Sequence, residues 1–86
     1  MAWRIEFERA AEREFRAPDV QTALSFLRDR VASAPNPRIV GQPLKGRYQG
    51  LWKYRIGDYR VIARIEGAAG LIVVARVGNR RDVYRR

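Results

Sequence analysis

The chain has 86 residues, with 18 lysines and arginines against 9 aspartates and glutamates, and so carries a net charge of +9 at pH 7. The absence of cysteine and histidine excludes disulfides and thiolate zinc sites and leaves metal binding to carboxylates alone, so we expect no metal and no other cofactor. No apolar run approaches the roughly 18 residues of a membrane-spanning helix, and the N-terminus lacks the apolar stretch of a secretion signal, which predicts a single cytoplasmic domain over residues 1–86 that does not act at a membrane.

The excess of positive charge is confined to the second part of the chain. Residues 1–34 carry six basic and six acidic side chains, whereas residues 35–86 carry twelve basic and three acidic ones. A general preference for arginine over lysine would not explain this confinement. Because a basic surface of this kind attracts polyanions by releasing their counterions, we predict a nucleic acid, and RNA above all, as the partner.

The N-terminal part of the sequence predicts a strand followed by two helices. Over residues 3–7 apolar and charged residues alternate, which is typical of a half-buried strand. Over residues 8–16 the apolar residues recur every four positions, which predicts a helix. A second helix is predicted from Asp19, a suitable N-cap, to a point before Pro35. The short break between the two helices favours a helical hairpin.

The C-terminal part predicts a loop followed by three strands. Proline and glycine punctuate residues 35–50, and the hydrophobic period then changes to two. Strands are predicted over residues 52–56, 59–65 and 71–77, the last of them apolar on both faces as a central strand would be. The order βααβββ predicts an α+β fold in which the N-terminal strand and the helical hairpin pack on an antiparallel sheet.

Gly57-Asp58 is predicted to be a two-residue hairpin turn, because glycine in the first position suits a type II′ turn. The pairs that follow are Ile56 with Tyr59, Arg55 with Arg60, Tyr54 with Val61, Lys53 with Ile62 and Trp52 with Ala63. The apolar residues then share one face, while Lys53, Arg55 and Arg60 share the other. Like charges opposite one another destabilise a sheet by roughly 0.2–1 kcal/mol, so we interpret this cluster as a phosphate site. The alternative is that the arginine side chains simply splay into water.

The C-terminal residues add candidates to the same site. The chain leaves the last strand through Gly78, which would bring Arg80 and Tyr84 to the sheet edge. A tyrosine ring there can stack on a base, although a frayed, solvated tail is the alternative reading. Further contacts to RNA are expected from four more basic residues of this half: Lys45, Arg47, Arg81 and Arg85.

Several segments together resemble the RelE family of bacterial and archaeal toxins. They are Leu44-Lys45-Gly46, residues 51–62, residues 76–80 and Val83-Tyr84. The likeness covers essentially the whole chain, including the βααβββ order. It implies the toxin of a type II toxin–antitoxin pair, which inhibits translation by cutting mRNA in the ribosomal A site without a metal. It also implies a RelB-like antitoxin as partner and a monomer when free.

The resemblance assigns roles to individual residues. It puts the family's pair of basic residues on the sheet face at Lys53 and Arg55, the phosphate-stabilising arginine at Arg60, a second C-terminal arginine at Arg80 and the stacking tyrosine at Tyr84. Arg55 departs from the lysine that stands at both strand positions in the best-known member. Asn79 also departs, since a basic residue or histidine often stands there.

Metal-free RNA cleavage requires the 2′-OH to attack the adjacent phosphate, which leaves a 2′,3′-cyclic phosphate and a 5′-OH. One group must accept the 2′-OH proton, and others must stabilise the phosphorane and protonate the leaving oxygen. Arginine is a poor base, so Lys53 and Tyr84 remain as proton acceptors. Arg55 and Arg60 would clamp the phosphate, and Arg80 would serve the leaving oxygen. Such weakly suited groups predict that the ribosome must position the message, with little activity on free RNA.

Two other functions remain open at this point. One is a ParE-like toxin, which acts on DNA gyrase and does not cut RNA; the complete set of basic residues plus tyrosine favours RelE. The other is a non-catalytic relative that binds nucleic acid or an antitoxin, which the arginine at position 55 keeps open.

Overall fold

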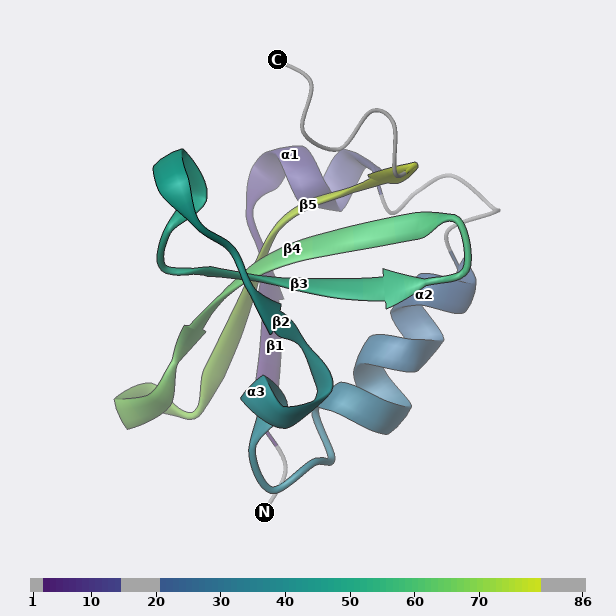
Figure 1. Cartoon of the computed structure of the whole chain (residues 1–86). Helices are drawn as coiled ribbons and strands as arrows, with labels where there is room; N and C mark the ends of the chain where they lie inside the picture. The colour runs from purple at the N-terminus through teal and green to yellow at the C-terminus, as the bar shows by residue number, and fades with distance from the viewer. Residues whose placement is uncertain (1–2, 15–20, 80–86) are drawn as a thin grey trace.

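The computed structural model describes residues 3–14 and 21–79, which form a five-stranded sheet with helices packed against it (Figure 1). The strands are β1 (Arg4–Phe7), β2 (Gln42–Pro43), β3 (Leu51–Ile56), β4 (Tyr59–Glu66) and β5 (Leu71–Asn79). The helices are α1 (Arg9–Glu14), α2 (Gln21–Phe26), which continues as a π-helix over Leu27–Val31, and α3 (Pro37–Val40). The predicted α+β class is therefore confirmed. The predicted N-cap of the second helix, Asp19, lies outside the described residues.

The strands follow the order β1-β5-β4-β3-β2 across the sheet. β1 runs parallel to β5, and the three other pairings are antiparallel. The strand that the sequence predicted to be central, β5, lies between β1 and β4, so hydrogen-bonded neighbours cover both of its edges. A bulge between Ile62 and Ala63 leaves Ala75 of β5 without a direct partner on β4.

The β3–β4 hairpin has the predicted register at all five pairs, including Arg55 opposite Arg60. Gly57 has a φ of +59°, and none of the described non-glycine residues has a positive φ. A positive φ at the first turn position alone is the signature of the predicted type II′ turn. The hairpin register is thus set locally, by one glycine and the alternation of its two strands.

The core lies between the sheet and the two longer helices. The largest fully buried side chains of the described residues are Tyr54, Leu27, Ile72, Val31, Val61, Val74 and Val77. Ala11 of α1 and Ala23 of α2 belong to the same cluster, so both helices pack on one face. The helical residues of α2 and its continuation that enter the core recur at intervals of four, which is the spacing of one helix face.

The segment predicted as a loop, residues 35–50, contains three short elements: α3, β2 and a 3-10 turn over Gly46–Tyr48. Asn36 caps α3, since its side-chain Oδ1 accepts a hydrogen bond from the Arg38 N–H at 3.0 Å, and Pro37 stands at the first helical position. β2 then pairs with β3 over two residues. Elements of four and two residues leave no periodicity for sequence analysis to detect. In the described part of the chain, no helix is long and apolar enough to cross a membrane.

Candidate nucleic-acid interface

Tyr54 holds the strand that carries the predicted site. It lies between Lys53 and Arg55 on β3 with its side chain fully buried, because alternate residues of a strand point to opposite faces. Its hydroxyl donates a hydrogen bond to the Pro37 carbonyl at 2.9 Å. Burial raises the pKa of this phenol to about 12, so it stays protonated in the native protein. Tyr54 therefore anchors β3 and leaves Lys53 and Arg55 on the opposite face.

The structure brings Lys53, Arg55 and Arg60 together on that face, as the register predicted. Their exposure differs, however. Arg55 is exposed, Lys53 is half-buried, and Arg60 is only 7% exposed. The three cations thus lie on one face of the sheet but differ in their exposure to solvent.

Arg60 folds back onto the hairpin turn. Its Nη1 donates to the Gly57 carbonyl at 3.0 Å and to the Tyr59 carbonyl at 2.9 Å. We expected the side chain either to join an open phosphate site or to splay into water, and neither arrangement is observed. The two carbonyl oxygens accept from one guanidinium nitrogen and hold the Arg60 side chain at the turn. A role of Arg60 in binding phosphate stays a prediction.

Ion pairs neutralise other arginines of the basic half. Arg64 contacts Glu66 at 2.6 Å and Glu8 at 3.3 Å, and these carboxylates raise the pKa of its guanidinium. Arg76 contacts Glu14 at 3.3 Å. The acidic partners Glu8 and Glu14 come from the N-terminal part, far away in sequence, so no local signal could have revealed these pairs.

The predicted site residues are not among these pairs. Among residues 3–14 and 21–79, the four ion pairs all involve Arg4, Arg64 or Arg76. Residues 35–57 contain five basic and no acidic residues. Four exposed arginines of the helices also lie outside these pairs, but acidic residues stand beside them in the sequence: Arg9, Arg13, Arg28 and Arg30. In the described part of the chain, β3 and the segment before it are therefore the stretch whose basic residues have no acidic residue among them.

Lys45 and Arg47 lie at the other end of β3 from the Gly57 turn (Figure 1). They belong to the loop between β2 and β3, which is closed by a hydrogen bond from the Leu44 N–H to the Leu51 carbonyl at 3.0 Å. Both side chains are exposed, and the Arg47 guanidinium lies 5.4 Å from the centre of the Tyr48 ring. The predicted site residues of the described chain therefore form two groups. One is in the loop before β3 and the other is on the β3–β4 hairpin: Lys45 and Arg47, and Lys53, Arg55 and Arg60.

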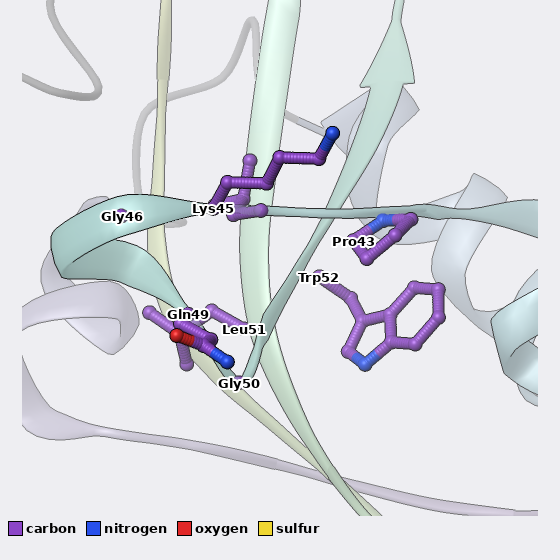
Figure 2. Close-up of a pocket in the computed structure, with 8 residues that line it drawn as sticks. Pro43, Lys45, Gly46, Gln49, Gly50, Leu51 and Trp52 are labelled. Carbon is purple, nitrogen blue, oxygen red and sulfur yellow. The ribbon is translucent and has the colours of Figure 1, made fainter.

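This loop encloses a hollow of about 430 Å³ that sequence analysis did not predict (Figure 2). Residues 43–46 and 49–52 line it. Pro43 and Trp52 are partners across β2 and β3, and their rings lie side by side (Figure 2). The only sequence signal for the hollow is the pair of glycines at positions 46 and 50, which have φ values of +66° and +96°.

The remaining predicted residues, Arg80, Arg81, Tyr84 and Arg85, lie outside the described residues. The strand that leads to them ends beside the hairpin, because Asn79 pairs with Tyr59 and Gly78 with Arg60. Asn79 is exposed at this point. Among the described residues, no three aspartate or glutamate side chains come together as a metal site would require.

Comparison with known proteins reveals the family. The family model for the ParE toxin of the type II toxin–antitoxin system, parDE, matches residues 5–84. Toxin RelG of Mycobacterium tuberculosis is 40% identical over 50 residues, an aligned segment that spans 58% of each protein. The chain therefore belongs to the RelE/ParE superfamily of toxins of type II toxin–antitoxin systems.

Solved structures show the same fold. The toxin–antitoxin complex RelBE2 of Mycobacterium tuberculosis contains a chain with a TM-score of 0.82 and 26% identity, and the match covers 95% of both chains. The isolated RelE toxin of E. coli has a TM-score of 0.71 and 21% identity over 91% of this chain and 84% of that one. The RelE-like fold that the resemblance implied is thus confirmed.

Proposed function

We propose that this protein is a RelE-like toxin that inhibits translation by cutting mRNA in the ribosomal A site. The observation that supports this most is the exposed cationic face of β3, where Lys53 and Arg55 form none of the ion pairs seen among the described residues. Arg64 and Arg76, by contrast, each have a carboxylate partner. A phosphate of the bound message would take the place of that partner.

The proposed reaction uses residues of this chain and needs no cofactor. The 2′-OH attacks the adjacent phosphate, a new 2′-O–P bond forms, and the 5′-O–P bond breaks to give a 2′,3′-cyclic phosphate and a 5′-OH. Lys53 or Tyr84 accepts the proton of the 2′-OH, and Arg55 stabilises the charge of the phosphorane. Arg80 stabilises or protonates the leaving 5′ oxygen. Arg60 assists at the phosphate once its side chain leaves the Gly57 and Tyr59 carbonyls.

The proposal also covers the location of the toxin, its oligomeric state and its antitoxin partner. We expect residues 1–86 to act as one domain in the cytoplasm, monomeric when free. A RelB-like antitoxin would silence it by covering the cationic face. The antitoxin proposal is supported by the RelBE2 complex of Mycobacterium tuberculosis, whose toxin-like chain shares the fold and 26% of the sequence.

The test is a translation reaction with purified ribosomes and a defined message, in which primer extension maps the 5′ ends of the fragments. Lys53→Ala and Arg55→Ala are compared with Arg9→Ala, which removes an exposed cation from α1, away from the proposed site. We expect cuts in A-site codons for the wild type and Arg9→Ala, and their loss in the two β3 variants. An intact message with the wild type would refute the proposal.

The second candidate is a ParE-like toxin, the type that the description of the matching family model names, whereas the similar proteins reported above are RelG, RelBE2 and RelE. It predicts an intact message together with inhibition of gyrase supercoiling. The same protein preparations therefore decide between the two activities.

A further inference from the structure

The hollow inside the β2–β3 loop has the form of a binding site. Its floor is built from the Pro43–Trp52 pair, and Lys45 is also among the residues that line it (Figure 2). Gln49 and Gly50 lie on its other side. Gly46 and Gly50 are both exposed and both have a positive φ, so the loop turns sharply at these two positions.

We propose that this loop binds one base of single-stranded RNA, stacked on Trp52, while Lys45 contacts a neighbouring phosphate. The volume of about 430 Å³ falls within the range of small-molecule sites, roughly 300–1,000 Å³, and so accommodates a single nucleoside. Trp52 is half-buried and packs against the core on one side, which fixes the plane of the indole. A fixed aromatic plane beside a cation is the usual arrangement for holding an unpaired base.

The positive charge of the surrounding segment favours a nucleotide as the occupant of the loop. Residues 35–57 carry Arg38, Lys45, Arg47, Lys53 and Arg55 and no acidic residue. A cationic or neutral ligand would gain nothing from this field, whereas a nucleotide brings a phosphate along with its base. Arg47 already lies over the Tyr48 ring, so Lys45 is the cation of the loop that is placed for a phosphate beside Trp52.

The hollow lies beside the strand that carries the proposed cleavage site, but on its other face. Arg55 lies three residues after Trp52 on β3, about 10 Å away at roughly 3.4 Å per residue. Because side chains alternate along a strand, Trp52 and Arg55 point to opposite faces of β3, and the loop is a separate contact site. The inference rests on the proposed function for its substrate class, RNA: the loop would add a contact to the message away from the scissile phosphate.

The test uses Trp52 as its own reporter. The chain has two tryptophans, so Trp3→Phe leaves Trp52 as the single source of indole fluorescence. This variant is titrated at low ionic strength with a 2′-O-methyl RNA strand, which lacks the attacking hydroxyl, and with a strand of equal length and charge that has no bases. Lys45→Ala and Arg9→Ala are added separately in the same background.

We expect the strand with bases to quench Trp52 and to bind about 5- to 100-fold more tightly than the abasic strand, as base stacking on an aromatic side chain implies. Lys45→Ala should weaken binding of both strands and reduce its salt dependence, whereas Arg9→Ala should change neither. Equal affinity for the two strands with unchanged Trp52 emission would overturn the inference. The titration requires neither a ribosome nor cleavage, so its result is independent of the translation assay. Quenching in the titration with an intact message in the translation assay would support the loop site and refute the nuclease. Cleavage in the translation assay without quenching in the titration would support the nuclease and refute the loop site.

Discussion

Arg60→Ala should destabilise the protein far more than Arg55→Ala, although the two arginines face each other on the same hairpin. Arg60 is 7% exposed, and its guanidinium donates to two carbonyls of the turn, at 3.0 and 2.9 Å. Hydrogen bonds from charged groups contribute about 1.5–3 kcal/mol each. Since both bonds leave from one nitrogen, we take the lower part of the range and expect a loss of about 2–4 kcal/mol.

Thermal unfolding followed by circular dichroism measures this difference. For a domain of this size each kcal/mol corresponds to roughly 4–8 °C in Tm, so Arg60→Ala should lower Tm by on the order of 10–20 °C. Arg55 is exposed, and its replacement should change stability by no more than about 0.5 kcal/mol. Equal Tm values for the two variants would show that Arg60 does not brace the turn. The result also matters for activity assays. A loss of cleavage in Arg60→Ala would otherwise be attributed to a lost contact with the phosphate, although the variant has also lost stability.

Two further predictions concern Tyr54 and its neighbours. Burial raises the pKa of the phenol from 10.0 to about 12, so between these pH values the native state binds more protons than the unfolded state, and stability should fall with rising pH by about 1.4 kcal/mol per unit. Urea midpoints across this range should show a shallower fall for Tyr54→Phe, and identical slopes would contradict the assignment. Gly41→Ala should destabilise by about 1–3 kcal/mol through overpacking, because the new Cβ would lie 2.8 Å from Cε1 of the Tyr54 ring. The backbone of Gly41 is extended, with a φ of −104°, so an unchanged urea midpoint would mean that the ring moves aside at no cost.

The hairpin was predictable because its determinants are local. One glycine and the alternation of two strands fix every pair from Trp52–Ala63 to Ile56–Tyr59. The parallel pairing of β1 with β5 was not predictable, since it joins residues nearly seventy positions apart, such as Arg4 and Leu71, and strand alternation carries no information about a distant partner. The bulge at Ala75 was missed for a related reason: β5 is apolar on both faces, so a shift in its alternation leaves no trace in the sequence.

The sequence was enough to predict which residues of β3 belong to the candidate site. It was not enough to predict how deeply each side chain is buried or which groups it contacts. Lys53 and Arg55 share a face because of their spacing alone. The burial of Arg60 depends on the turn carbonyls that its side chain reaches. The carboxylate of Arg76 and one of the two that contact Arg64 come from residues distant in sequence, whereas the shorter Arg64 contact is to nearby Glu66. Sequence charge counts therefore overstate the number of cations available to RNA, while they identify correctly the segment in which these cations lie.

Tyr54 connects the two ends of the proposed interface. Its side chain enters the core, its hydroxyl bonds to Pro37 in α3, and its ring lies under Gly41, just before β2. One buried residue thus fixes the strand position of Lys53 and Arg55 and also the start of the strand that leads into the β2–β3 loop. An RNA strand that contacts both groups requires their separation to be constant, and a shared core anchor provides this without contacting the RNA. Substitutions at Tyr54 or Gly41 that preserve the fold should therefore impair positioning of the message before they impair the chemistry of any single cation.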